Sequence, residues 1–146
     1  MISRPKRWIC DASVAAKLFF EEPHSDKAHE LFSDLGQDSQ VRIYAPELIC
    51  LEFANILAKR HRQGLIRSAQ ATLMEKEFSS LAMDLIPDSA LASEALFLGL
   101  RLGISAYDAA YVTLSLRLNV PLVTADGRLL SSLTRLEGEF IALEDL

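Results

Sequence analysis

The feature that most constrains this chain is the alternation of short apolar runs with longer stretches of helical periodicity. We expect the apolar runs to form strands at residues 8–10, 41–44, 85–86, 121–124 and 140–143. The stretches between them predict helices over residues 12–20, 24–35, 46–63, 68–81, 88–102 and 105–119. Strands that alternate with helices form a parallel sheet with both faces covered. The sequence therefore predicts an α/β fold with a central, mainly parallel sheet of four or five strands.

Length and composition set the size and the class of the protein. The 146 residues fit one domain spanning 1–146. Hydrophobic residues make up 50% and charged residues 24%, which argues against a disordered chain. Two cysteines, Cys10 and Cys50, are too few for a disulfide framework or a cysteine zinc site. Each lies in an apolar run, so we expect two buried, reduced thiols.

Charge and hydrophobicity also bear on location and partners. No apolar stretch approaches the ~20 residues of a membrane span. Arg4, Lys6 and Arg7 could begin a signal peptide, but Asp11 interrupts the following apolar run too early. We therefore expect a soluble, cytoplasmic protein. The net charge of −5 disfavours a protein held to nucleic acid mainly by phosphate electrostatics.

Acidic side chains follow two of the predicted strands. Asp11 comes directly after the first strand, and Asp126 follows the strand at 121–124. Asp108 lies in the first turn of the helix that Ser105 caps. In parallel sheets, ligands bind beyond the carboxyl ends of the strands, where the strand order reverses. If the strands before Asp11 and Asp126 are neighbours, their carboxylates converge.

Each of these three acids also has a simpler, structural interpretation, which we favour for each one taken singly. Asp11 and Asp126 are reasonable helix caps or turn residues. Asp108 is three residues after Ser105, which fits a capping-box pattern with aspartate in place of glutamate.

Glu52 is a fourth candidate, about two turns into the helix predicted over 46–63. It interrupts an apolar stretch, and a buried acid without a partner costs free energy. The alternative is an exposed stripe on which Glu52 lies with Asn55 and Lys59. The sequence does not decide whether Glu52 is buried or lies on the exposed stripe.

The four acids together suggest metal chemistry. Carboxylates that share one site repel each other and resist ionisation unless a cation neutralises them. Oxygen ligands select Mg²⁺ or Mn²⁺ over zinc. Such a cation can activate water and can hold the oxygens of a phosphoryl group during in-line displacement.

Three segments carry a family resemblance, and they read WICDASVAAKLF, APELICLEFANIL and SAYDAAYVTLSLRLNVPLVTADGRLL. In sequence, order and separation they resemble PIN-domain ribonucleases, and more narrowly the VapC-type toxins of toxin–antitoxin pairs. The most specific parts are YDAAY at 107–111 and TAD at 124–126. The resemblance covers nearly the whole chain.

The resemblance implies a three-layer sandwich and a Mg²⁺-dependent endoribonuclease, with Mn²⁺ as a substitute. It assigns the catalytic roles to Asp11, Glu52, Asp108 and Asp126, with Asp11 and Asp108 as the metal ligands. Hydroxyl support for the acids would come from Ser13 and Thr124, and Asn55 would hydrogen-bond within the site. The implied partners are RNA, a cognate antitoxin, and a second copy of the chain in a homodimer or a higher assembly.

The remaining charges allow RNA as a substrate. Without the four acids the net charge changes from −5 to −1, so the rest of the chain is nearly neutral. Local cations that could contact RNA are Lys59, Arg60, His61, Arg62 and Arg67, although cations at a helix C-terminus more often only complement the helix dipole.

Other residues carry simpler expectations. We expect surface positions for the three histidines, His24, His29 and His61. Three apolar sites could lie in the core or in an interface, with the core as the default: Leu96, Leu100 and the pair Leu65–Ile66.

Two other functions remain as alternatives. A phosphatase of the haloacid dehalogenase type also begins with an aspartate after a first strand, but it needs a second aspartate where this chain has Ser13. A catalytically silent PIN-like module that binds RNA or protein is the other, and the presence of all four acids counts against it. Glycine-rich phosphate-loop motifs are absent from the sequence.

Overall fold

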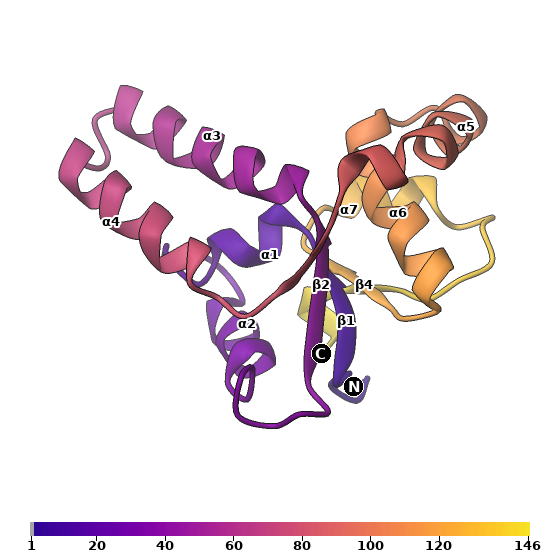
Figure 1. Cartoon of the computed structure of the whole chain (residues 1–146), viewed down its shortest axis with the longest axis horizontal. Coiled ribbons are helices and arrows are strands. Elements are labelled where there is room, and N and C mark those ends of the chain that lie inside the picture. The colour runs from indigo at the N-terminus through magenta and orange to yellow at the C-terminus, as the bar shows by residue number, and fades with distance from the viewer. Residues whose placement is uncertain (1) are drawn as a thin grey trace.

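The computed structural model describes residues 2–146 and is built around a five-stranded parallel sheet (Figure 1). The strand order is β3-β2-β1-β4-β5, and every neighbouring pair runs parallel. The strands are β1 (Arg7–Cys10), β2 (Arg42–Pro46), β3 (Asp84–Ile86), β4 (Leu122–Thr124) and β5 (Phe140–Ala142). The predicted parallel sheet is confirmed. Its strand order reverses between β1 and β4, which makes these two strands the topological switch point.

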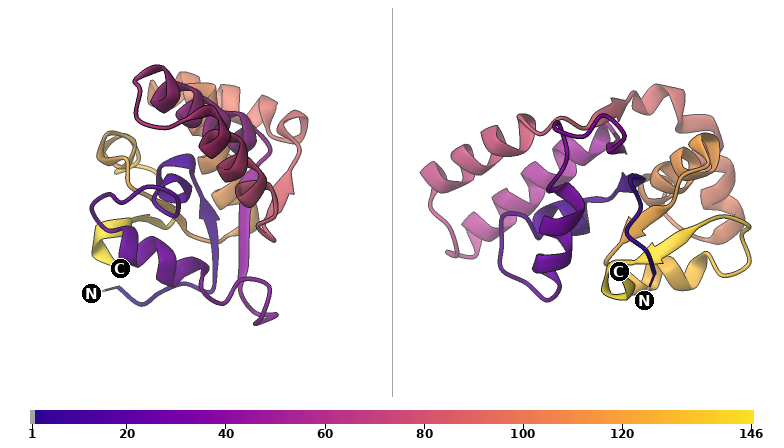
Figure 2. Two further views of the ribbon diagram at one scale, coloured as in Figure 1. Left: turned by 90° about the vertical axis from the view of Figure 1, so that its left-hand side faces the viewer. Right: turned by 90° about the horizontal axis from the view of Figure 1, so that it is seen from below.

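Helices lie on both sides of this sheet. They are α1 (Ala12–Ala16), α2 (Ser25–Phe32), α3 (Leu48–Arg62), α4 (Ser68–Ser79), α5 (Ala92–Leu102), α6 (Ala106–Leu118) and α7 (Gly127–Ser132), with short 3₁₀ turns η1 (Asp88–Ala90) and η2 (Leu143–Asp145). Helices α3 and α4 lie side by side and project from the sheet, whereas α5 and α6 pack together on the opposite side (Figures 1 and 2). The carboxyl ends of β1 and β2 lie between these two helix pairs (Figure 1).

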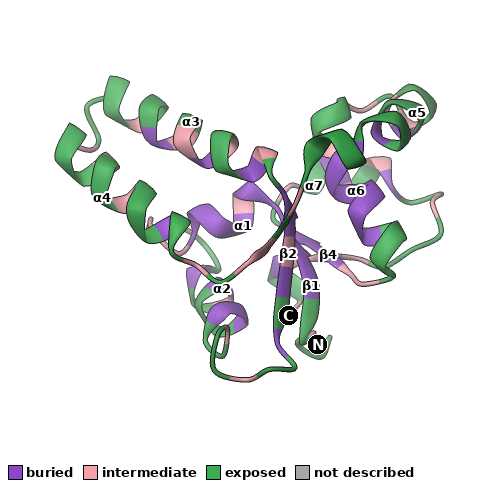
Figure 3. Ribbon diagram, in the orientation of Figure 1, coloured by how far each residue is buried: buried purple, intermediate pink, exposed green. Residues whose placement is uncertain are grey.

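Consecutive strand residues are buried, as a sheet covered on both faces requires. Trp8, Ile9 and Cys10 of β1 are fully buried, and so are Leu122 and Val123 of β4 (Figure 3). The α3–α4 pair is joined to the rest of the core by aromatic rings that include Phe19, Phe53 and Phe78, with the last two stacked at 4.3 Å between centroids.

Several predicted boundaries are wrong by a few residues. The helix predicted over 12–20 ends at Ala16 and continues as turns, and the one predicted over 24–35 ends at Phe32. Pro46 ends β2 opposite Ile86 instead of beginning α3, because the end of a strand tolerates a residue without an N–H. Helix α7 was foreseen only through the capping potential of Asp126.

Two burial predictions are also wrong, and helix geometry explains them. Cys50 is exposed, because the buried face of α3 is set by Ile49, Phe53 and Leu57 at intervals of four residues. In α5 the buried side chains are Ala95 and Leu98, which leaves Leu96 and Leu100 exposed by 57% and 78%. Leu65 is 64% exposed as well, and only Ile66 of that pair packs partly against the core.

The length and the hydrophobicity of the helices among residues 2–146 decide whether one of them could span a membrane. No single helix there is both long enough and apolar enough to cross a bilayer, and α5 and α6 meet that composition only as a pair bent by 111°.

Candidate active site

The acids that follow β1 and β4 meet at the switch point. β1 and β4 are neighbours, with Cys10 paired to Val123, so Asp11 and the loop that carries Asp126 leave the same edge of the sheet. The Thr124 hydroxyl donates a hydrogen bond to Asp11 Oδ2 and accepts one from the Asp126 backbone N–H at 3.0 Å. One threonine therefore connects the two acidic segments.

Asp11 is the most buried of the acids. Its Oδ1 accepts hydrogen bonds from the Ser13 hydroxyl at 2.5 Å and from the Val14 N–H at 3.1 Å. Burial raises the pKa of Asp11, the hydrogen bonds from Ser13, Thr124 and Val14 lower it in part, and the charge of Asp126 raises it further. The hydroxyl support expected of Ser13 and Thr124 is present.

Glu52 faces the site rather than an exposed stripe. It is half-buried on α3, and the Tyr111 hydroxyl of α6 donates a hydrogen bond to its Oε1 at 2.5 Å. Burial is the main cause that raises the pKa of Glu52, and the charges of Asp108 and Asp11 add to it, whereas the Tyr111 bond lowers it. Asn55, one turn further along α3, is exposed.

Tyr111 contacts the acidic group, although the sequence did not predict this contact. In the sequence it is the last residue of the YDAAY motif. It lies three residues after Asp108, so both side chains project from one face of α6. That spacing was the available signal, but the hydroxyl's partner is 59 residues away in the chain.

Asp108 lies in the first turn of α6. Gly103, in the left-handed conformation with φ 70°, ends α5 and lets Ser105 begin α6. The Ser105 hydroxyl oxygen accepts a hydrogen bond from the Asp108 N–H at 3.0 Å, as the capping pattern predicted. Burial raises the pKa of Asp108, and the charge of Asp126 raises it further.

Asp126 is part of the same group and also caps a helix. Its Oδ1 accepts hydrogen bonds from the N–H groups of Arg128 and Leu129 at the start of α7. Its charge acts on both Asp11 and Asp108, while Glu52 is affected by those two acids. Asp11 and Asp108 thus each interact with both Glu52 and Asp126, and they connect the four predicted acids into one group.

The donor set fits a divalent cation that retains part of its water. Among residues 2–146, no three His, Cys, Asp or Glu side chains form a group tight enough to hold an ion by themselves. Mg²⁺ does not require one, since it commonly binds through one or two carboxylates and keeps several waters. Asp11 accepts three hydrogen bonds and a carboxylate offers about four lone-pair sites, so one remains for a metal. Burial is the main cause that raises the pKa of Asp11, Glu52 and Asp108, and neighbouring carboxylates add to it. A bound cation would favour the ionised form of all three against both effects.

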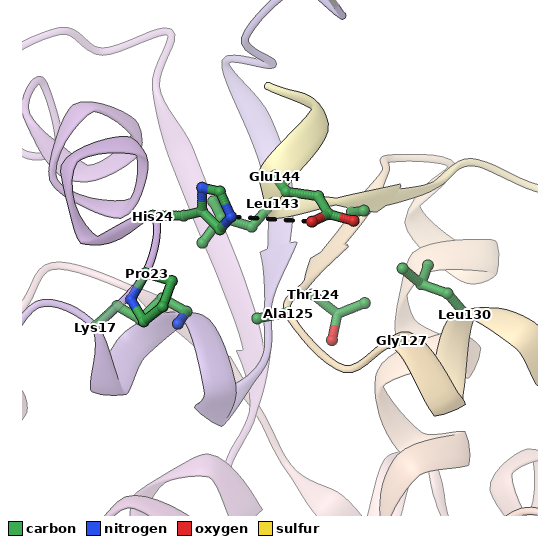
Figure 4. Close-up of a pocket in the computed structure, with 10 residues that line it drawn as sticks. Lys17, Pro23, His24, Thr124, Ala125, Gly127, Leu130, Leu143 and Glu144 are labelled. Carbon is green, nitrogen blue, oxygen red and sulfur yellow. Dashed lines mark ion pairs between the residues drawn. The ribbon is translucent and has the colours of Figure 1, made fainter.

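A cavity of about 310 Å³ adjoins the Thr124 side of the site (Figure 4). Figure 4 shows Thr124 and Ala125 near its centre, with Lys17 on one side and Leu130 on the other. His24 and Glu144 form an ion pair at 3.9 Å across its edge. All three histidines are exposed, as predicted.

The chain is similar to known proteins along most of its length. The family model of the PIN domain matches residues 8–135. "Ribonuclease VapC3" of Pyrobaculum aerophilum is 31% identical over 123 residues, which cover 83% of this chain and 90% of the relative.

Solved structures extend the likeness to the fold. The crystal structure of PAE2754 from Pyrobaculum aerophilum has a TM-score of 0.70 at 25% identity and covers 95% of this chain and 85% of its own. A toxin-antitoxin complex from Klebsiella pneumoniae contains a chain that matches with a TM-score of 0.64 at 12% identity, over 92% of this chain and 96% of that one.

Proposed function

Since this chain belongs to the PIN domain family, in its VapC-type branch, we propose that it is a Mg²⁺-dependent endoribonuclease. The observation that carries the proposal is the convergence of Asp11, Glu52, Asp108 and Asp126 at the switch point, where burial and mutual charge raise the pKa of three of them. An RNA phosphodiester is the proposed substrate, and the proposed products are a 5′-phosphate and a 3′-hydroxyl.

In this proposal the four acids and the two hydroxyl residues have different roles. Asp11 and Asp108 hold the cation directly, and Glu52 and Asp126 complete the site directly or through water. A bound divalent cation supplies positive charge against the phosphodiester and lowers the pKa of the attacking water. Ser13 and Thr124 orient Asp11 and favour its ionised form, because their hydroxyls donate to its two oxygens.

The proposed partners follow from the same relatives. We propose that the protein is a cytoplasmic toxin inhibited by a cognate antitoxin, since a structural neighbour is a toxin-antitoxin complex. We further propose a homodimer or a higher assembly. Its support is the row of exposed apolar side chains on α5, namely Leu96, Phe97 and Leu100.

Cleavage of RNA by the purified protein, with Mg²⁺ or with EDTA, tests the activity. Mutation of a group that only supports a metal ligand commonly lowers activity by about 10–100-fold. Asp11 and Asp108 are the proposed ligands themselves, so Asp11→Asn and Asp108→Asn should each lower the cleavage rate by more than about a hundredfold. Asp26→Asn, on the exposed surface of α2, is the matched control and should cleave as the wild type does.

Two results would contradict the proposal. Cleavage by Asp11→Asn or Asp108→Asn at the wild-type rate would show that these acids do not hold the catalytic cation. RNA binding without cleavage, together with no Mn²⁺ bound in a titration, would identify a catalytically silent binding module instead.

A further inference from the structure

A second cavity, of about 510 Å³, lies between α1 and α3 on the other side of Lys17. We call it the basic cavity, and its polar lining consists of Ser13, Lys17, Glu22, Lys59, Arg60 and Gln63. Because Ser13 donates its hydroxyl to Asp11, this cavity begins at the candidate active site. Lys17 and Ala125 also line the cavity of Figure 4, so the two cavities adjoin.

The charge of the basic cavity is opposite to that of the site beside it. Its wall carries three cationic side chains, Lys17, Lys59 and Arg60, and one carboxylate, Glu22. The chain as a whole has a net charge of −5. Positive charge is therefore concentrated locally, next to the four acids, instead of being spread over a broad face.

The two innermost cations share a single counter-ion. Glu22 accepts a hydrogen bond from Arg60 at 2.6 Å and one from Lys17 at 3.3 Å. The Lys17 side chain is only 10% exposed, so it has little access to water. One carboxylate leaves this trio with a net charge of +1. Within residues 2–146, each of the two cations donates one side-chain hydrogen bond, so most of their N–H donors have no protein partner there.

Arg60 is also held in place by an aromatic ring. Its guanidinium carbon lies 3.8 Å from the centroid of the Phe20 ring. A stacked guanidinium is pre-organised, so it loses less conformational entropy when it binds an anion. Planar Arg donors match the oxygens of a phosphate.

We propose that the basic cavity binds an RNA phosphate adjacent to the one that is cleaved, with Lys17 and Arg60 as its ligands. This inference rests on the proposed function and adds a substrate subsite to it. A strand that presents one phosphodiester to the four acids carries its neighbouring phosphates along the same backbone, and the cavity continues from the acids. Contacts of this kind position the strand without reading its sequence.

Binding of a fluorescein-labelled single-stranded RNA, measured by anisotropy in EDTA so that no cleavage occurs, tests the proposal. Lys17→Met and Arg60→Gln should each bind about tenfold more weakly at low salt. Each should also reduce the slope of log K against log salt by about 0.7. Arg101→Gln is the matched control, since Arg101 lies in the last turn of α5, is exposed and does not line the cavity. Its salt slope should match that of the wild type.

Glu22→Gln tests whether Lys17 and Arg60 bind RNA or only stabilise the fold through their ion pairs with Glu22. It breaks the same ion pairs but frees both cations, so it should bind RNA at least as tightly as the wild type. A purely structural network predicts that Glu22→Gln loses as much RNA affinity as Lys17→Met. In Mg²⁺, Lys17→Met should raise KM and change kcat little, because the contact is remote from the reacting bond. Circular dichroism checks that each variant is folded.

The outcomes for the cavity and for the enzyme are distinguishable. Wild-type salt slopes in both Lys17→Met and Arg60→Gln would overturn the subsite, even if Mg²⁺-dependent cleavage persists. Cavity-dependent RNA binding without any metal-dependent cleavage would support the subsite and overturn only the nuclease. Stronger competition by a polyglutamate peptide than by unlabelled RNA would assign the cavity to an acidic protein ligand and would also overturn the subsite.

Discussion

Asp11 and Asp126 each serve two purposes with one side chain. Each accepts backbone N–H hydrogen bonds at the start of a helix, and each belongs to the acidic group at the switch point. The structural and the functional interpretation of these residues are therefore not alternatives. A carboxylate held by N–H donors is fixed in direction, which suits a side chain that has to meet other acids at one point.

Tyr111→Phe tests how Glu52 is held. The hydroxyl lowers the pKa of Glu52, so its loss should raise that pKa and move the acidic limb of the pH–rate profile of kcat/KM to higher pH. Activity at neutral pH should fall by about 10–100-fold. Tyr107→Phe, on the same helix but 69% exposed, is the control. An unchanged profile in Tyr111→Phe would show that the hydroxyl does not position Glu52.

At the scale of elements, α3 has to carry Glu52 to the site while much of its length projects from the sheet (Figure 1). The contact that holds it is aromatic, with Phe53 packed between Phe19 and Phe78. Phe53 is adjacent to Glu52, so the same turn of α3 both anchors the helix and supplies the acid. Loss of this anchor should affect stability and the site together.

Phe53→Ala measures that anchor. Removal of a fully buried phenylalanine should lower the free energy of unfolding by about 3–5 kcal/mol. Leu51→Ala, two residues earlier but 78% exposed, should change it by no more than about 0.5 kcal/mol. Urea denaturation followed by circular dichroism compares the two, and equal losses would mean that the aromatic cluster does not anchor α3.

At the scale of the whole molecule, the acidic group couples stability to pH. The pKa values of Asp11, Glu52 and Asp108 are raised in the folded protein, so the folded state takes up protons at higher pH than the unfolded chain does. Without a cation, these groups should therefore make the free energy of unfolding increase as the pH falls through their folded pKa values. Groups such as Asp38, whose pKa is lowered by the Gln40 N–H, contribute with the opposite sign.

Comparison of the wild type with Asp108→Asn in EDTA isolates this effect, since Asp38 is common to both. The wild type should gain more stability than Asp108→Asn as the pH falls, as measured by urea denaturation at a series of pH values. Saturating Mg²⁺ should stabilise the wild type, and more so at higher pH, because protons compete with the cation. A larger gain in Asp108→Asn on acidification would contradict the raised pKa of Asp108.

Association of two copies is also a property of the whole molecule. If the exposed face of α5 forms the proposed homodimer, the wild type should have a mass in solution that is a multiple of 16.2 kDa. Leu100→Glu should reduce it to a monomer, because a charge would then be buried in an apolar interface. Leu73→Glu is the control, because it makes the same substitution at a leucine that is 58% exposed on α4. It should leave the mass in solution unchanged. Light scattering coupled to size exclusion checks both.

The order of most elements and the parallel sheet were readable from the chain, because periodicity and turn residues are local properties. The four acids were singled out together by the resemblance to PIN-domain ribonucleases. Long-range packing decided the rest. The pairing of β1 with β4 brings Asp11 beside the Asp126 loop, and Tyr111 reaches Glu52 across 59 residues. The rotation of α3 and α5 about their axes exposes Cys50 and Leu100. Neighbouring residues in the sequence do not reveal these contacts or exposures, because each depends on which faces of distant elements are buried against one another.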